Sequence, residues 1–130
     1  MIDIRRAAAF LLLPVLVLTS SVTAQEAPAD GERLFRTRCA SCHSIEPGQS
    51  RIGPNLAGVF GRAAGKADGA RYSPALSASD MVWSTETLNA FLTNPRQVVS
   101  GTTMTFALRD ATQRTAIIAF LRERAAAAPN

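Results

Sequence analysis

Apolar positions repeat at helical spacing in a segment that begins near Pro28. Gly31, Leu34, Phe35 and Cys39 follow one another at intervals of one, three and four residues, which places them on one face of a helix. Proline is compatible with a first helical turn, because its missing N–H has no intrahelical partner there. The pattern therefore predicts a first helix that begins near residue 28, after a short tail.

A second amphipathic segment follows Ser84. Leu88, Phe91 and Leu92 lie at the spacing of an apolar helix face. The dipeptide at 94–95 is Asn-Pro, and the residue before a proline is disfavoured in helical conformation. We therefore expect a helix that starts after Ser84 and stops before the proline.

The last helical pattern lies near the C-terminal end. Asp110 can cap its first turn, and Ile117, Ile118 and Leu121 follow at core spacing. The pattern fades in the alanines of 125–128. This segment predicts the final helix of the chain.

Long irregular segments separate these helices. Residues 44–72 contain eight glycines or prolines and are expected to form an ordered loop, and 95–109 is expected to form another. Ser73 followed by Pro74 predicts a short helix through Ser77. Since no alternating stretch is long enough for a strand, the chain is expected to be all-α, with three to five helices and long loops that need something to pack on.

The first 24 residues have the pattern of a secretory signal peptide. Arg5 and Arg6 precede an apolar run over 7–18, and Val22 and Ala24 occupy the positions that a signal peptidase reads. A retained membrane anchor is the alternative, but the run is well short of the ~20 apolar residues that span a bilayer. We therefore divide the chain into a signal peptide at 1–24 and one domain at 25–130, and expect the mature protein in the periplasm without stable membrane insertion.

The charged residues indicate a mildly basic chain, which bears on the kind of partner and not on the fold. The chain has 14 Lys and Arg against 10 Asp and Glu, of which Arg5, Arg6 and Asp3 lie in the signal segment. The remaining arginines are scattered and do not form the basic stripe of a nucleic-acid-binding protein. A mild positive charge instead favours encounter with an acidic protein partner.

The candidate chemistry lies in one short run that reads Cys39-Ala40-Ser41-Cys42-His43. It contains both cysteines and the only histidine of the chain. In a helical conformation Cys39, Cys42 and His43 share one face, because residues three and four apart are neighbours. C-x-x-C-H is the attachment pattern of a c-type haem, with two thioether bonds from the thiols and the histidine as proximal iron ligand.

Three other interpretations of this run are less favourable. A redox disulfide of the thioredoxin kind requires a βαβ setting that the patterns do not predict. Two cysteines and one histidine leave a four-ligand structural zinc site incomplete. The histidine could also be a packing residue, but this leaves the spacing of the two cysteines unexplained.

The residues leave three candidates for a sixth iron ligand, since no second histidine exists. These are Met81, Met104 and Lys66. A neutral lysine is scarce at pH 7, given its ordinary pKa of about 10.4. Met104 follows a glycine-containing loop that can fold over an open haem face, so spacing favours it over Met81.

The chain resembles the class I c-type cytochromes, in the cytochrome c and cytochrome c2 branch, over nearly all of residues 28–124. The matching segments are Gly31-x-x-Leu34-Phe35, Cys39 to His43, Gly53-Pro54-Asn55-Leu56, Gly61-Arg62, Tyr72, Trp83, Gly101-Thr102-x-Met104 and Ile117 to Leu121. The resemblance implies the small all-α cytochrome c fold, wrapped around one covalent haem c.

The resemblance also implies roles for individual residues. Met104 would be the axial sulfur ligand opposite His43, and the carbonyl of Pro54 would accept a hydrogen bond from the other ring nitrogen of His43. The side chains that would donate to a buried haem propionate are Arg62, Tyr72 and Trp83. Gly31 would allow the first and last helices to cross closely, with Phe35 and Phe120 packed around the crossing.

Three residues depart from the family pattern. Phe91 stands where the family often has Tyr, Leu76 where Asn is common, and Thr103 where Lys is frequent. The first two remove polar groups beside the haem, and the third removes a lysine from the docking face. Ligation is unaffected, but the redox potential and the charge of that face are expected to differ.

The function that follows is a soluble electron carrier that shuttles single electrons between a donor and an acceptor protein, and not an enzyme in its own right. The alternative is the haem subunit of a periplasmic oxidoreductase complex. A haem peroxidase or a gas sensor would need an open sixth position, against which Met104 argues. We expect a monomer that meets its partners through an arginine-bearing face, formed by Arg38, Arg51, Arg96 and Arg109.

Overall fold

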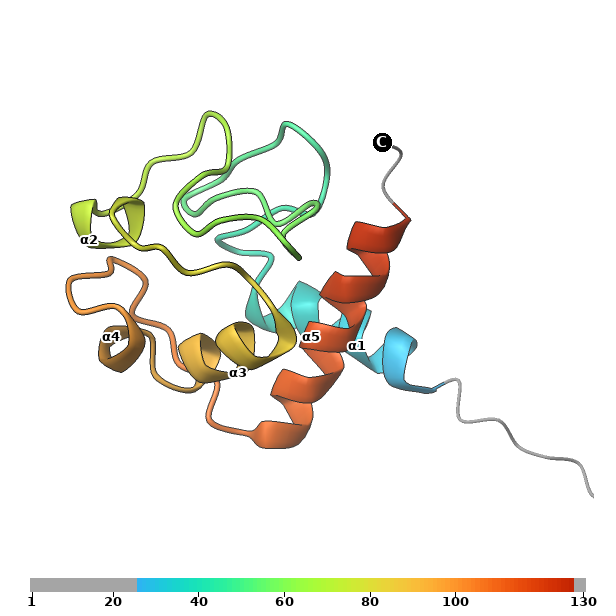
Figure 1. Cartoon of the computed structure of the whole chain (residues 1–130). Helices are drawn as coiled ribbons and strands as arrows, with labels where there is room; N and C mark the ends of the chain where they lie inside the picture. The colour runs from blue at the N-terminus through green and yellow to red at the C-terminus, as the bar shows by residue number, and fades with distance from the viewer. Residues whose placement is uncertain (1–25, 128–130) are drawn as a thin grey trace, which may run out of the picture.

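The computed structural model describes residues 26–127 of the chain (Figure 1). Within this range it has five helices and no strand, apart from one isolated antiparallel bridge between Ala63 and Val82. The helices are α1 (Glu26–Arg38), α2 (Pro74–Ser77), α3 (Thr85–Thr93), α4 (Pro95–Val98) and α5 (Ala111–Ala126). This confirms the all-α prediction and the expected number of helices. The proposed signal peptide lies outside the described residues.

Side-chain caps fix where the helices begin. The Ser73 hydroxyl accepts from the backbone N–H of Leu76 at the start of α2, and the Asp110 carboxylate accepts from that of Gln113 at the start of α5. Ser84 caps α3 in a reciprocal arrangement with Thr87. The three predicted helix starts are therefore confirmed, because each depends on a residue that satisfies unpaired backbone donors locally.

The prediction of an unbroken loop over 95–109 is wrong at its start. Pro95 ends α3, but it also opens α4 as that helix's first residue, and the Asn94 side chain accepts from the backbone N–H of Gln97. Asn94 therefore ends one helix and caps the next. A four-residue helix has too few positions to show an apolar repeat, so only the cap could have indicated it.

Helices α1 and α5, from opposite ends of the described chain, cross and pack together (Figure 1). Gly31 is buried at the crossing, and a Cβ atom there would lie 2.7 Å from the Cβ of Phe120 and would also meet the Ala116 carbonyl. The rings of Phe35 and Phe120 lie 5.7 Å apart between centroids. The close crossing implied by the family resemblance is thus present.

Arg114 of α5 is buried and connects three segments. Its guanidinium donates to the Asn89 side chain on α3 at 2.9 Å, and to the carbonyls of Leu108 and Arg109 at 2.8 and 2.7 Å. Leu108 also donates its backbone N–H to the Leu92 carbonyl at 2.8 Å. These bonds hold the segment that follows Met104 against α3 and α5.

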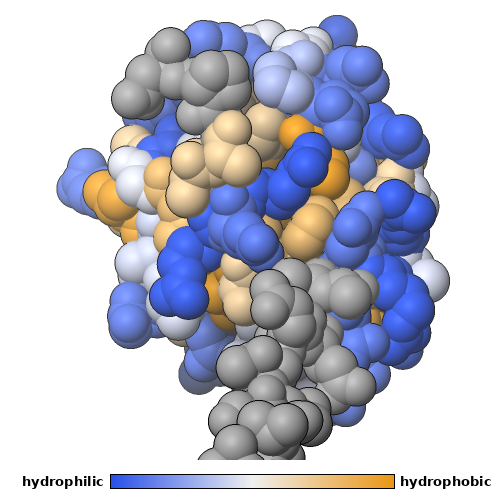
Figure 2. Space-filling view, turned by 90° about the vertical axis from the view of Figure 1, so that its right-hand side faces the viewer, coloured by the Kyte–Doolittle hydropathy of each residue, from blue (hydrophilic) through white to orange (hydrophobic). Residues whose placement is uncertain are grey.

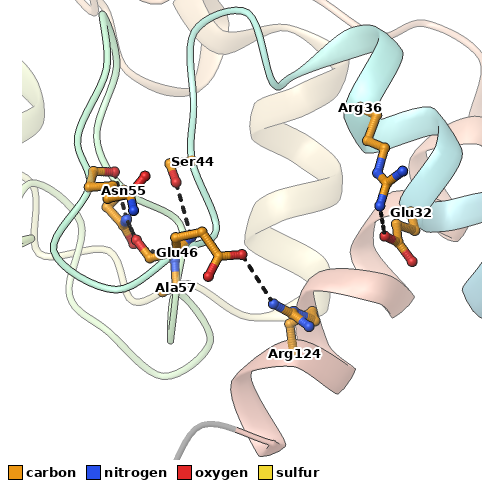
Figure 3. A network of polar contacts seen from close by, with 8 residues as sticks. Glu32, Arg36, Ser44, Glu46, Asn55, Ala57 and Arg124 are labelled. Atoms are coloured by element: carbon orange, nitrogen blue, oxygen red, sulfur yellow. Dashed lines mark hydrogen bonds and ion pairs between the residues drawn. The ribbon is translucent and has the colours of Figure 1, made fainter.

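Polar contacts close the loop that follows His43 (Figure 3). The Asn55 amide donates to the carbonyls of Glu46 and Gln49, and its oxygen accepts from the Ala57 N–H at 2.7 Å. The Glu46 carboxylate lies 3.6 Å from the guanidinium of Arg124 on α5. The loop is therefore ordered by its own side chains and tied to the last helix.

The face on the α1 and α5 side is mostly hydrophilic, with small hydrophobic areas between the polar side chains (Figure 2). None of the helices between residues 26 and 127 has the length and apolarity needed to cross a membrane.

Candidate functional site

The two cysteines lie in a turn that directly continues α1. The helix ends at Arg38, so the Cys39–His43 motif is not part of an α-helix, although the sequence analysis considered it in a helical conformation. The backbone N–H groups of Cys42 and His43 nevertheless both donate to the Cys39 carbonyl, at 3.0 and 2.9 Å. This keeps the pitch of a helical turn, and both thiols and the imidazole line one cavity. No disulfide joins the two cysteines.

The His43 ring is held by the segment that follows the loop. Its Nδ1 lies 2.8 Å from the Pro54 carbonyl, which can only accept, so Nδ1 carries the proton and Nε2 keeps its lone pair. Burial lowers the pKa of His43, against a smaller opposite effect of the Pro54 hydrogen bond, so the ring is neutral at pH 7. A neutral imidazole with a fixed tautomer is the form that binds a metal.

Gly53 allows this close approach. A Cβ atom at this position would lie 2.8 Å from Nδ1 of His43, and so a larger residue would displace the ring. The backbone N–H of Gly53 donates to the Cys42 carbonyl at 2.8 Å. This bond fixes the segment of Gly53 and Pro54 against the turn formed by residues 39–43, which we call the attachment turn.

Burial also raises the pKa of the Cys39 thiol to about 11, with a smaller contribution from the neighbouring Cys42. Both sulfurs are partly buried at the cavity wall. A largely protonated Cys39 does not resemble the low-pKa thiolate of a disulfide oxidoreductase. The site therefore holds Cys39 as a neutral thiol, and both cysteines line the apolar cavity.

This cavity has a volume of about 530 Å³ and a wall made mainly of core residues. Apolar side chains come from every part of the fold: Leu56, Val59, Leu76, Leu88, Phe91, Leu92, Leu108, Ile117 and Leu121. Much of the hydrophobic core, including residues that the long loops contribute, thus faces this cavity. A second cavity of about 490 Å³ lies between α1 and the start of α5, but its lining is largely polar and includes neither cysteine.

Of the three candidate sixth ligands, only Met104 lines the apolar cavity. Its backbone N–H lies 3.4 Å from the hydroxyl of Thr102, which is itself buried. Met81 packs partly buried against the core elsewhere, and the Lys66 ammonium donates to the Ser77 carbonyl at 3.0 Å. The structure therefore brings Met104 and His43 to the same cavity, while axial ligation itself stays a prediction.

The three predicted propionate donors also line this cavity. Backbone bonds from Gly61 N to Trp83 O, at 2.9 Å, and from Trp83 N to Arg62 O, at 3.0 Å, place Arg62 beside Trp83. The Tyr72 hydroxyl accepts from the Ala67 N–H at 3.2 Å, which leaves its own proton to donate. Their roles toward a propionate stay predictions.

Arg62 provides a test of whether a haem fits. Its two terminal nitrogens donate to the carbonyls of Ala57 and Asn55, at 2.9 and 2.8 Å. Its Nε is buried and has no partner among the described residues. A buried donor without an acceptor is costly, so it indicates an anionic or polar group at this end of the cavity. A flat apolar group with carboxylate arms, ligated by His43, fits these residues.

The sequence missed several residues at the mouth of the cavity. Arg71 lines it, as do Ile52 and Phe106, whose side chains are 88% and 42% exposed. No motif or periodicity marks these positions. Only the folded loops could show that they lie at one opening.

The predicted arginine-bearing face is only partly supported. Arg38 lines the cavity, and Arg51 lies nearby with its guanidinium bonded to the Ala40 carbonyl at 2.7 Å. Arg96 and Arg109 are exposed but do not line the cavity.

Comparison with known proteins agrees with the fit of a haem to this cavity. The family model described as Cytochrome c matches residues 28–125. The cytochrome c of Theileria annulata is 46% identical over 98 residues, which cover 74% of this chain and 84% of the relative. That of Chlamydomonas reinhardtii is 41% identical over 110 residues, covering 80% of this chain and 98% of the relative. The chain belongs to the cytochrome c family.

As a class I cytochrome c, the protein carries one covalent haem c, and Cys39 and Cys42 have the spacing that attaches it. Proteins of this family are haem electron carriers and not enzymes, and they act with redox partners. The confirmed fold, family and cofactor leave the compartment, the partners and the oligomeric state as proposals.

Proposed function

We propose that this cytochrome is an exported, monomeric carrier of single electrons between a donor and an acceptor protein in the periplasm. The observation that carries the proposal is the apolar cavity onto which both His43 and Met104 open. With a nitrogen and a sulfur ligand available to one iron, no position is left open for substrate or gas. The proposal is thus a carrier and not a peroxidase or a sensor.

When bound, haem c supplies an iron centre that changes its oxidation state by one electron. The protein's own residues determine how easily that happens. The Pro54 carbonyl, 2.8 Å from Nδ1 of His43, fixes the ring and makes it a stronger donor. The thioether of Met104 would favour the reduced state as an iron ligand, and the core side chains that line the cavity would keep water away from the site.

The partner is expected to dock at the mouth of the cavity. Ile52 and Phe106 provide exposed apolar contacts there, and Arg38 adds a positive charge. No Asp or Glu of residues 26–127 lines the cavity. We infer a partner that presents an apolar patch with acidic residues around it.

Export is proposed from the first 24 residues alone. Their basic start, short apolar run and small residues at 22 and 24 support a cleaved signal peptide. The match to the family model begins only at residue 28, so these residues precede the part that this model covers.

One set of measurements on the protein purified from its native host tests the carrier proposal. Acid acetone should fail to extract the pigment, and the intact mass should equal residues 25–130 plus one haem. The reduced form should not bind carbon monoxide rapidly. Extractable haem would refute covalent attachment, rapid binding of carbon monoxide would favour the peroxidase or sensor, and a mass that includes residues 1–24 would refute cleavage. Stable copurification with larger redox subunits would instead favour the haem subunit of an oxidoreductase complex.

A further inference from the structure

Arg71 is a cation at the haem cavity to which neither the motifs nor the family pattern gives a role. It directly precedes Tyr72, outside any helix, and it is an exposed residue that lines the cavity. No hydrogen bond or ion pair within residues 26–127 involves its guanidinium. Lys66, the other cation in this part of the loop, does have a partner, because its ammonium group donates to the Ser77 carbonyl.

The charges in the cavity do not balance within the protein. Three arginines line it, Arg38, Arg62 and Arg71, whereas no described Asp or Glu does. A haem brings two propionate groups, each a carboxylate at pH 7. The buried, unpaired Nε of Arg62 can serve one of them, which leaves the second without a cationic partner in the interior.

The position of the attachment turn indicates which of the two remaining arginines, Arg38 or Arg71, lies near the second propionate. The vinyl groups and the propionates occupy opposite edges of a haem, so thioether bonds at Cys39 and Cys42 direct the propionates away from the turn. Arg38 directly precedes Cys39 and is therefore at the vinyl edge. Arg71 directly precedes Tyr72, which is one of the expected propionate donors, and both line the cavity, so Arg71 is on the propionate side.

We propose that Arg71 binds the second, more exposed haem propionate through its guanidinium. The proposal rests on a haem in this cavity, as the proposed function requires. A guanidinium matches a carboxylate with two parallel N–H···O bonds, which a lysine cannot form. Because Arg71 is at the rim, its effect on folding stability is small, as for exposed ion pairs generally.

The expected consequence is electrostatic. A positive charge that neutralises a propionate disfavours the ferric state, which carries one more positive charge than the ferrous state. Arg71→Ala should therefore lower the equilibrium constant for reduction about threefold, or ~30 mV at 59 mV per tenfold for one electron. Arg71→Lys should give a smaller decrease, because it keeps the charge but loses the paired geometry.

Arg38→Ala is the matched control, because Arg38 also lines the cavity and is also exposed. The midpoint potentials of wild type, Arg71→Ala, Arg71→Lys and Arg38→Ala would be measured by spectroelectrochemical titration with small mediators and without a protein partner. We expect a decrease in the Arg71 variants and a clearly smaller change in Arg38→Ala. An unchanged potential in Arg71→Ala, or equal decreases in both alanine variants, would overturn the proposal.

A second readout separates propionate binding from docking. The rate of oxidation by ferricyanide, an anionic reagent, reports the charge at the haem edge. If Arg71→Ala slowed this reaction as much as Arg38→Ala but left the potential unchanged, Arg71 would be a docking residue and the proposal would be wrong. If the wild-type protein held no covalent haem, the proposed function would fail instead, which the mass measurement distinguishes.

Discussion

At the scale of single residues, the two methionines within residues 26–127 have clearly different surroundings. Met104 lines the haem cavity, whereas Met81 packs against the core away from it. We expect Met104→Ala to abolish the weak near-infrared sulfur-to-iron band of the oxidised protein and to lower the midpoint potential, because a thioether ligand favours ferrous iron. Met81→Ala should keep the band. Loss of the band in Met81→Ala alone would show that the ligand is wrongly assigned.

Phe91 allows the polarity around the sulfur to be changed. It is buried, lines the cavity with Met104, and packs edge-on against Trp83 with 5.1 Å between ring centroids. In Phe91→Tyr the new hydroxyl can hydrogen-bond to the Met104 sulfur and alter its donation to iron. We expect a measurable shift of the midpoint potential with the near-infrared band retained.

Phe120→Tyr is the control for that experiment. Phe120 is equally buried but packs on Phe35 at the helix crossing and does not line the cavity. Its substitution should affect stability, by about 1–3 kcal/mol if the hydroxyl stays unsatisfied, and leave the potential unchanged. Equal potential shifts in both variants would mean that the hydroxyl acts only by loosening the protein.

At the scale of the elements, the crossing of α1 and α5 depends on one absent side chain. Alanine normally stabilises a helix by about 1 kcal/mol relative to glycine. Gly31→Ala should nevertheless destabilise the protein, by roughly 1–3 kcal/mol, because its Cβ would overlap the Ala116 carbonyl and the Cβ of Phe120. Thr115→Ala, at an exposed position of α5, should change the free energy of unfolding by less than about 0.5 kcal/mol. Denaturant unfolding of both variants measures this, and a stabilised Gly31→Ala would contradict the close crossing.

The helices were predictable where their boundaries depend on neighbouring residues. Ser73, Ser84 and Asp110 each satisfy a backbone donor three residues further on, and this is visible in the sequence. Helix α4 was missed because Pro95 was interpreted only as a terminator, although Asn94 also caps a new turn. Hydrogen bonds from capping side chains therefore make the starts of α2, α3 and α5 predictable from the sequence. Helix α4 is too short to show an apolar repeat and is not predictable in that way.

The part of the site that consists of residues close together in the sequence was predictable. Cys39, Cys42 and His43 form one short motif, and Met104 could be favoured but not assigned from spacing. The bond from His43 to Pro54 spans 11 residues and came only from the family resemblance. Arg71 and Ile52 reach the cavity because of how the 44–72 loop folds, which depends on tertiary contacts such as those of Asn55 and not on any periodicity.

At the scale of the whole molecule, the mouth of the cavity offers few free charges to the partner that we propose docks there. Arg38 contributes a positive charge, the proposed propionate contact would neutralise that of Arg71, Arg51 is bonded to the Ala40 carbonyl, and Thr103 contributes none. We therefore expect the rate of electron transfer with the native partner to fall only moderately, about two- to fivefold, as ionic strength rises to 0.15 M and the Debye length shortens to about 8 Å. Stopped-flow measurements over a series of ionic strengths test this. A rate that rises with salt would mean that the partner's face is basic.

The α1–α5 crossing also bears on how the protein is made. Phe35 is buried against Phe120, and 85 positions of sequence separate the two. During synthesis, a nascent chain that ends before α5 cannot bury this pair, and the core residues Ile117 and Leu121 do not yet exist. The domain can therefore close only once α5 is available, so an incomplete or only partly exported chain stays open and its attachment turn stays accessible until the last helix arrives.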